Sequence, residues 1–288
     1  MSKKTNAYLL IYILSASSNY FFVKSGLSYS DPLTLMALRY ALAGASLAIP
    51  LAALHRLDPI IDTDMLLLSA FTAASTGFWA IGLTYVDPGT SAVLSYTMPL
   101  FAVPFSMIML HESPSRGNVI GVIVGFLGVM VYYISFLGSV ELIGAVFTVI
   151  NAVFWALYSV YFRKLGNREP MNVVAMQMLI SSLMLIAVAI PMGIRIRLQP
   201  MFLLDLAGTS LVGGSALFLF WNLIINHMGV SRAVSVVFLV PALTILLNYL
   251  VLGRAPTTLE LIGATIMFVG IYISQRRSLN IKGPTSSP

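Results

Sequence analysis

Long apolar runs, separated by short polar breaks, dominate the sequence and restrict the fold more than any motif does. A helix that crosses a bilayer needs roughly 20 mostly apolar residues. Membrane β-strands instead alternate polar and apolar residues over about ten positions. The sequence therefore predicts an all-α polytopic membrane protein with ten transmembrane helices, at about residues 7–27, 31–54, 64–86, 88–110, 115–136, 139–163, 170–193, 203–226, 230–252 and 257–275.

The composition excludes most other classes. Charged residues make up 9% of the 288 residues and hydrophobic residues 58%, with a mean hydropathy of +0.92. A soluble domain carries about 25% charged residues, so an ordinary soluble enzyme, a disordered chain and a coiled coil are excluded. The absence of cysteine excludes disulfides, thiolate metal sites and cysteine nucleophiles.

The distribution of positive charge predicts the orientation. With the N-terminus inside, eleven of the sixteen lysines and arginines fall on the inner side, four on the outer side and Arg39 within a span. Cytoplasmic loops carry this excess in membrane proteins, so the net charge of +6 does not indicate nucleic-acid binding. We expect a multi-pass protein of the inner (cytoplasmic) cell membrane with both termini, including the tail 279–288, in the cytoplasm.

Acidic residues followed by proline separate several of the apolar runs. Examples are Asp31-Pro32, Asp87-Pro88 and Glu169-Pro170. Proline suits the first turn of a helix, where its missing N–H costs nothing. Each pair therefore predicts the start of a helix.

An internal repeat appears when the sequence is compared with itself at an offset of about 140 residues. Pro99 meets Pro241, Trp79 meets Trp221, and the glycine pair 121 and 128 meets 263 and 270. We interpret residues 1–137 and 138–278 as two copies of a five-helix unit. An odd number of spans gives the copies opposite orientations, and inverted repeats of this kind permit alternating access to a site near the membrane midplane.

These features resemble the drug/metabolite transporter superfamily, and specifically its ten-helix EamA-type members, which include amino-acid exporters of the YddG kind. The resemblance covers about residues 7–277. It depends on the tandem units, the central prolines Pro99 and Pro241, and the turn Glu112-Ser113-Pro114 before a glycine-spaced fifth helix. It implies a pocket lined mainly by helices 1, 3, 4, 6, 8 and 9, with helices 5 and 10 at the periphery. The second copy departs from the pattern with Arg254 where the first has Glu112.

Proline and glycine within the spans each allow two interpretations. Pro99 and Pro241 remove backbone hydrogen bonds, so they either form gating hinges or leave static kinks. The glycines of helix 5 give a smooth face that suits either a homodimer seam or close packing within the monomer, and the second is favoured.

Polar side chains inside the spans are costly in lipid, so they should face the interior of the bundle. Together they predict a neutral, hydrogen-bonding, aromatic-walled substrate pocket. For a single serine or threonine, bonding to its own helix is the simpler alternative. The candidate substrate-binding residues of this type are Asn19, Thr76, Trp79, Ser95, Tyr96, Trp155, Tyr158, Trp221 and Asn222.

Lys24 and Arg39 are the cations within the spans of the first copy. Lys24 can extend to the headgroups from the outer end of helix 1. Arg39 lies about 12 Å into helix 2 at 1.5 Å per residue, and no mid-span carboxylate is available to pair with it. We therefore add both to the substrate-binding candidates, as groups that attract a substrate carboxylate, with pairing to helix-end carbonyls as the rival interpretation.

The sequence thus predicts a transporter of small polar metabolites, with amino-acid export as the leading hypothesis. The alternatives are transport of anionic or phosphorylated metabolites or drugs, and a membrane-embedded enzyme or sensor. No zinc-protease or Walker motif is present, so we expect no enzymatic activity, no metal and no cofactor. The expected partners are the lipid bilayer and a small solute, and a homodimer is possible.

Overall fold

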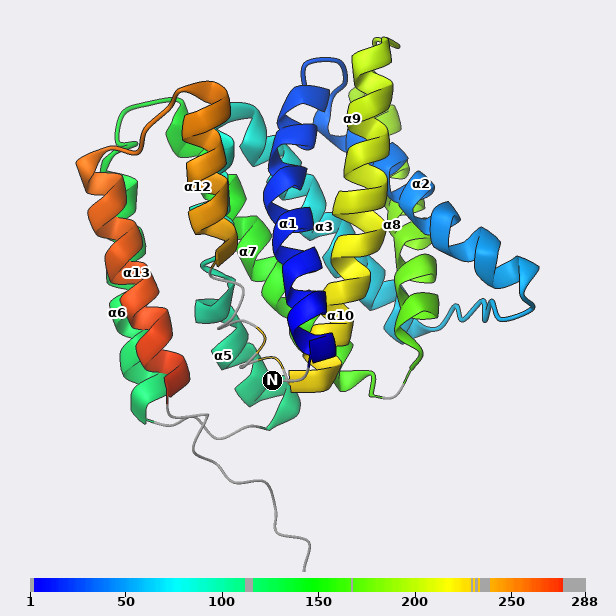
Figure 1. Ribbon diagram of the computed structural model, residues 1–288, viewed down its shortest axis with the longest axis horizontal. Coiled ribbons are helices and arrows are strands. Elements are labelled where there is room, and N and C mark those ends of the chain that lie inside the picture. Colours follow the sequence, from blue (N-terminus) through cyan, green and yellow to red (C-terminus); the bar gives the residue numbers. More distant parts are fainter. Residues whose placement is uncertain are drawn as a thin grey trace, which may run out of the picture.

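The computed structural model describes residues 3–111, 116–166, 168–228, 230, 233 and 239–276. Their helices lie side by side as one bundle (Figure 1). The helices are α1 (Lys3–Gly26), α2 (Pro32–Ala53), α3 (Thr63–Tyr85), α4 (Pro88–Ser95), α5 (Met98–Leu110), α6 (Arg116–Ile134), α7 (Glu141–Lys164), α8 (Pro170–Met192), α9 (Pro200–Ser210), the π-helix η1 (Leu211–Ala216), α10 (Leu217–Met228), α12 (Leu239–Leu252) and α13 (Thr258–Arg276).

Each predicted window corresponds to one helix or to consecutive helices. The fourth window is divided into α4 and α5, and the eighth into α9, η1 and α10. The ninth is described only from Leu239 onward, as α12. The all-α prediction is confirmed for the described residues, whereas the number of ten crossings stays a prediction.

Length and hydropathy identify six helical stretches among the described residues that can cross a membrane. Three further apolar helices are shorter, and α1, whose apolar sequence is interrupted by Ser17, Ser18 and Asn19, is not among the six. The six stretches are Pro32–Ala53, Thr63–Tyr85, Pro88–Leu110, Glu141–Lys164, Pro170–Met192 and Pro200–His227.

The acidic residues before proline start helices as predicted. The Asp31 carboxylate accepts a hydrogen bond of 2.9 Å from the backbone N–H of Thr34. Asp87 caps α4 in the same way, and Glu169 caps α8. Each carboxylate satisfies a backbone donor that has no partner inside its helix.

The glycines of α6 face α13 within the same chain. The two helices pack together along their lengths at one side of the bundle (Figure 1). A Cβ atom at Gly128 would overlap backbone atoms of Met267, and one at Gly270 would overlap Gly125. This confirms the packing interpretation, and it leaves this glycine face covered and unavailable as a homodimer seam.

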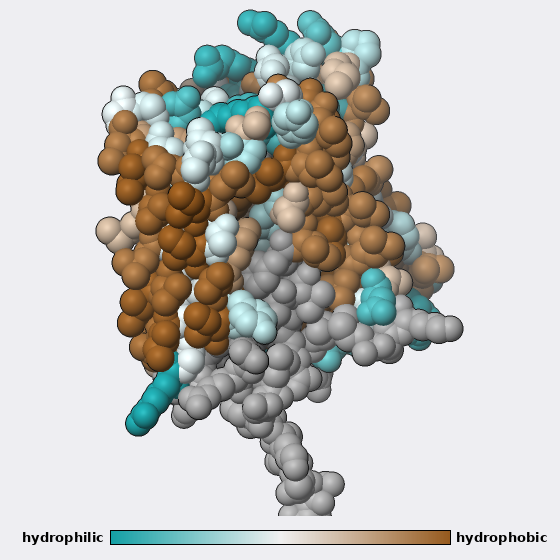
Figure 2. Space-filling view, turned by 60° about the vertical axis from the view of Figure 1, so that its left-hand side comes forward, coloured by the Kyte–Doolittle hydropathy of each residue, from teal (hydrophilic) through white to brown (hydrophobic). Residues whose placement is uncertain are grey.

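The surface and the chain ends agree with a membrane orientation. Figure 2 shows a broad hydrophobic band with hydrophilic residues gathered at its upper end. The first residues of α1 and the last residues of α13 lie at the same end of the bundle (Figure 1). An even number of crossings would produce this arrangement.

A cavity between the helices as the candidate functional site

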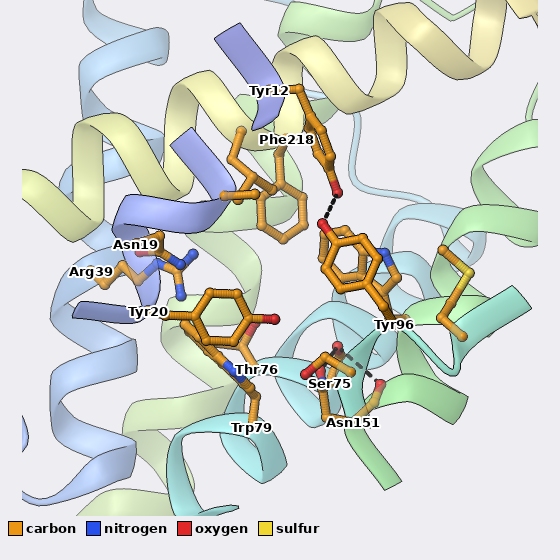
Figure 3. Close-up of a pocket in the computed structure, with 15 residues that line it drawn as sticks. Tyr12, Asn19, Tyr20, Arg39, Ser75, Thr76, Trp79, Tyr96, Asn151 and Phe218 are labelled. Carbon is orange, nitrogen blue, oxygen red and sulfur yellow. Dashed lines mark hydrogen bonds between the residues drawn. The ribbon is translucent and has the colours of Figure 1, made fainter. Parts of the chain in front are cut away.

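A cavity of about 70 Å³ lies inside the bundle. Figure 3 shows its walls, which α1, α2, α3, α7, α10 and the junction of α4 with α5 contribute. The lining residues are Tyr12, Ala16, Asn19, Tyr20, Arg39, Ser75, Thr76, Trp79, Ser95, Tyr96, Met98, Asn151, Trp155, Leu217 and Phe218.

Seven of the eleven predicted binding residues line this cavity. Five of the six helices that the resemblance implies also contribute to it, and α2 adds Arg39. The ninth predicted helix, which is α12 in the described part of the chain, contributes none of the lining residues. The seven residues are Asn19, Arg39, Thr76, Trp79, Ser95, Tyr96 and Trp155.

Three other predicted residues support the wall from behind. The Tyr158 hydroxyl donates to Asn222 Oδ1 over 2.8 Å and also accepts from Gln177 over 3.2 Å. Trp221 stacks on Tyr12 with ring centroids 5.1 Å apart. All three predicted residues are fully buried, and the Trp221 indole N–H donates to the Ser159 hydroxyl over 3.2 Å.

Lys24 lies outside the cavity. Its ammonium donates to the backbone carbonyls of Leu83 and Val86, over 2.7 and 2.8 Å. These carbonyls belong to the C-terminal end of α3, where a cation also complements the helix dipole. The geometry therefore supports the rival interpretation, in which Lys24 caps a helix.

Aromatic side chains form much of the cavity wall. The hydroxyls of Tyr12 and Tyr96 are 3.1 Å apart, and Tyr20 meets Trp79 edge to face at 5.2 Å between centroids. Phe218 lies 5.0 Å from the Trp155 ring. Sequence reasoning missed Tyr12, Tyr20 and Phe218, because an aromatic residue in an apolar helix gives no sign of whether it faces lipid or a cavity.

A chain of hydrogen-bonded neutral polar groups joins three of the helices that line the cavity. Ser75 donates to Asn151 Oδ1 over 2.8 Å, and Asn151 Nδ2 donates to Ser95 over 2.9 Å. The residues come from α3, α7 and α4, and Figure 3 shows Ser75 beside Asn151. They hold the wall in place and still present hydroxyl and amide groups to a solute.

Arg39 is the one cation among the lining residues that the structure describes. Only 2% of its surface is exposed, and its Nη2 donates to the carbonyl of Gly213 over 2.6 Å. The guanidinium carbon lies 5.4 Å from the Trp79 ring centroid and 5.3 Å from that of Tyr40. The Tyr40 hydroxyl in turn bonds to Thr76.

The π-helix η1 supplies the carbonyl that Arg39 binds. Gly213 has no room for a side chain, because a Cβ there would overlap the Asn19 amide. Thr209 donates to Asn19 Oδ1 over 2.8 Å and so fixes this amide. Short π segments often occur at functional sites. Here the segment is in contact with α1, α2 and α10, beside the Arg39 side chain.

The two prolines predicted as hinges lie in the first turns of α5 and α12. Pro99 is the second residue of α5, directly after the turn at Tyr96 and Thr97 that divides the apolar stretch Pro88–Leu110. Pro241 is the third residue of α12, and the residues directly before α12 lie outside the described part. The break at Tyr96 and Thr97 lies at the cavity, since Ser95, Tyr96 and Met98 line its wall.

Two charged clusters lie at opposite ends of the bundle. We name them the outer and the inner cluster after the orientation predicted from the sequence. The outer cluster consists of Asp87, Arg254 and Glu260, with Arg254 2.8 Å from Asp87 and 3.7 Å from Glu260. It lies beside a small pocket between α4, α6, α12 and α13. It joins the start of α4 to the start of α13.

The inner cluster consists of Asp62, Asp64 and Arg168. Arg168 lies 2.7 Å from Asp62 and 3.7 Å from Asp64. The hydrogen bond from Arg168 lowers the pKa of Asp62, and the same bond raises the pKa of Arg168. The cluster joins the start of α3 to the segment between α7 and α8.

A helical membrane bundle with a central cavity walled by polar and aromatic groups is typical of membrane transporters. The sequence profile of the EamA-like transporter family matches residues 3–134 and again 142–275. The chain therefore belongs to the EamA-like transporter family. This membership agrees with the expectation of a non-enzymatic transport protein.

Individual relatives and a solved structure support the same assignment. The chain is 41% identical over 240 residues to an "Uncharacterized transporter in sor 3'region" of Acidianus ambivalens, covering 83% of this chain and 92% of that one. It is 28% identical over 277 residues to the "Uncharacterized transporter YvbV" of Bacillus subtilis, covering 93% and 90%. A crystal structure with 18% identity superimposes with a TM-score of 0.72 over 98% of this chain and 100% of the other, which shows the same fold.

Proposed function

We propose that this protein moves a small polar metabolite across the cytoplasmic membrane by alternating access, with amino-acid export as the leading function. The observation that carries the proposal is the composition of the cavity. Helices α1 to α5 of the first predicted unit and α7 and α10 of the second all line it. A relative movement of the two units would therefore open and close the site.

The pairing of helices supports two units related by a twofold rotation. Under such a rotation, α2 pairs with α8 and α6 with α13, because each is the second or fifth helix of its unit, and both pairs are in contact. The contacts of α1 with α9 and α10 correspond to the contact of α3 with α7, and both are present. Reporter fusions at residues 30 and 168 should lie on opposite sides of the membrane, and the same side for both would contradict inverted repeats.

The charged clusters provide a means of closing either end. The outer cluster links α4 of the first unit to α13 of the second. The inner cluster links α3 of the first unit to the α7–α8 segment of the second. We propose that the two clusters break alternately during the transport cycle.

The alternatives differ in the charge that the cavity favours. Arg39 favours an anionic group, so anionic metabolites are the second candidate and cationic drugs are disfavoured. A phosphorylated metabolite would bring two negative charges to one arginine. A membrane-embedded enzyme or sensor would show no solute flux at all.

Transport into proteoliposomes is the direct test. The purified protein is reconstituted and offered amino acids, monocarboxylates, organic phosphates and organic cations, with and without a pH gradient. We expect saturable uptake of amino acids, and empty liposomes serve as the control. Binding of a solute without flux would favour the sensor, and flux of phosphates alone would favour the second transport candidate.

A further inference from the structure

We infer that the cavity selects its substrate by a single carboxylate bound to Arg39, with an apolar body between the aromatic walls, and that an amino group is not required. This inference builds on the proposed transport function and narrows the substrate class. It predicts that an amino acid and the corresponding acid without its amino group share the site.

The first observation is a buried charge without a counter-charge. Arg39 is 98% buried in α2, and no aspartate or glutamate is among the described residues that line the cavity. The buried carboxylate of Asp205 lies at the outer end of α1 beside Gly26. None of the ion pairs within the described ranges includes Arg39.

The second observation is unused hydrogen-bonding capacity on the same guanidinium. Arginine carries five N–H donors in a planar fork that matches a carboxylate. Arg39 uses Nη2 for the Gly213 carbonyl and Nη1 for the Met36 sulfur at 3.4 Å, which is a weak acceptor. Its Nε has no hydrogen-bond partner in the described structure. A buried cation with so few partners is costly, and a bound carboxylate would offset that cost.

The number of cations limits the charge of the ligand. Arg39 is the one lysine or arginine among the described residues that line the cavity, and Lys24 is held by the carbonyls at the end of α3. One guanidinium balances one negative charge. The site therefore fits a monocarboxylate better than a phosphate dianion.

The remaining walls show why an amino group is dispensable. Tyr20 and Trp79 lie beside Arg39, and Tyr12 and Tyr96 lie across the cavity from it (Figure 3). These groups offer aromatic faces and neutral hydroxyls, which pack well against an apolar body. An ammonium group would be repelled by Arg39, and the described lining residues offer it neutral hydroxyl and amide acceptors but no aspartate or glutamate.

Matched ligands test the inference on the unmodified protein in lipid nanodiscs. Isothermal titration compares leucine, 4-methylpentanoate, which is leucine without its amino group, 4-methylpentanamide and 3-methylbutylammonium. A hydrogen bond to a charged group is stronger than one between neutral groups. We therefore expect the two carboxylates to bind on the order of 10- to 100-fold more tightly than the amide. The ammonium compound should bind most weakly.

Variants then assign the preference to one side chain. Arg39→Gln should remove the difference between 4-methylpentanoate and its amide, whereas Arg39→Lys should keep part of it. Arg116→Gln is the matched control, because it removes an exposed positive charge at the start of α6. The melting temperature of each variant shows whether it is folded.

The outcomes separate this inference from the proposed function. Equal binding of the acid and the amide to the unmodified protein overturns the inference, as does a carboxylate preference that persists in a folded Arg39→Gln protein. Uptake of neutral or phosphorylated solutes, with no binding of either carboxylate, overturns the inference and leaves the transport function standing. Absence of flux for every solute class overturns the transport function itself.

Discussion

The outer cluster should contribute measurably to stability, and Arg254→Gln is the change that tests it. Arg254 lies in the segment between α12 and α13, with 41% of its side chain exposed. The side chains of Asp87 and Glu260 are only 9% and 4% exposed. Removing the arginine takes the ion-pair partner from two buried carboxylates.

The burial of the three side chains sets an upper and a lower limit on the loss of stability in Arg254→Gln. Breaking a fully buried pair costs about 3–5 kcal/mol, and an exposed pair contributes about 0–1 kcal/mol. Arg254 is partly in water, and both carboxylates keep helix-capping partners, with Asp87 accepting from Thr90 over 3.0 Å and Glu260 accepting from Thr257 over 2.7 Å. We therefore expect a loss of about 1–2 kcal/mol in the free energy of unfolding.

A double-mutant cycle measures the interaction in detergent. Chemical unfolding is compared for the unmodified protein, Arg254→Gln, Asp87→Asn and the double variant. The coupling energy should be about 1 kcal/mol, because the two charged groups are 2.8 Å apart. Arg197→Gln is the control, since it removes an exposed charge from the same end of the bundle.

Two results would refute this reasoning. One is a coupling energy near zero between Asp87 and Arg254. The other is a loss of stability in Arg254→Gln no greater than that in Arg197→Gln. Either would mean that water screens the outer cluster as it screens an ordinary surface pair.

Gly128→Val should lower the melting temperature strongly, because the new side chain would separate α6 from α13, and a thermal scan showing no change would contradict the close packing. Arg168→Gln should destabilise the protein at neutral pH, because it removes the partner that lowers the pKa of Asp62. The stabilisation is present above the ordinary aspartate pKa and disappears as the pH falls through the lowered one, so the two melting temperatures should converge in acid; a constant difference would contradict this. Pro99→Ala should slow transport at near-normal folded yield, because alanine would let α4 and α5 join across the break at residues 96 and 97; unchanged flux would leave Pro99 with a static role.

The sequence predicts the helices well because the signals that start them are local. A carboxylate followed by proline can cap a helix with no help from distant residues, as Asp31 and Glu169 do. Pro99 predicts a kink in the fourth span, whereas the division of that span at Tyr96 and Thr97 depends on how the surrounding helices pack. The glycine spacing predicts the smooth face of α6, but only the structure shows that this face packs against α13 of the same chain.

The candidate site was predictable only where a side chain was out of place in lipid. Arg39 and Asn19 stand out in apolar runs, and both line the cavity. Tyr158 and Asn222 stand out equally, but they bond to each other, and that pairing depends on how α7 and α10 pack. Tyr20 gave no signal, because its ring is as compatible with lipid as with a cavity wall.

Alternating access is the central claim, and cysteine accessibility tests it most directly. The natural chain has no cysteine, so Ser95→Cys would place a single thiol in the cavity wall. A membrane-impermeant maleimide is applied to right-side-out and inside-out vesicles, with and without 4-methylpentanoate. The account predicts labelling from both sides, slowed on both by the ligand, whereas Val160→Cys, fully buried in α7, stays unlabelled. Labelling from one side only, under every condition, would contradict it.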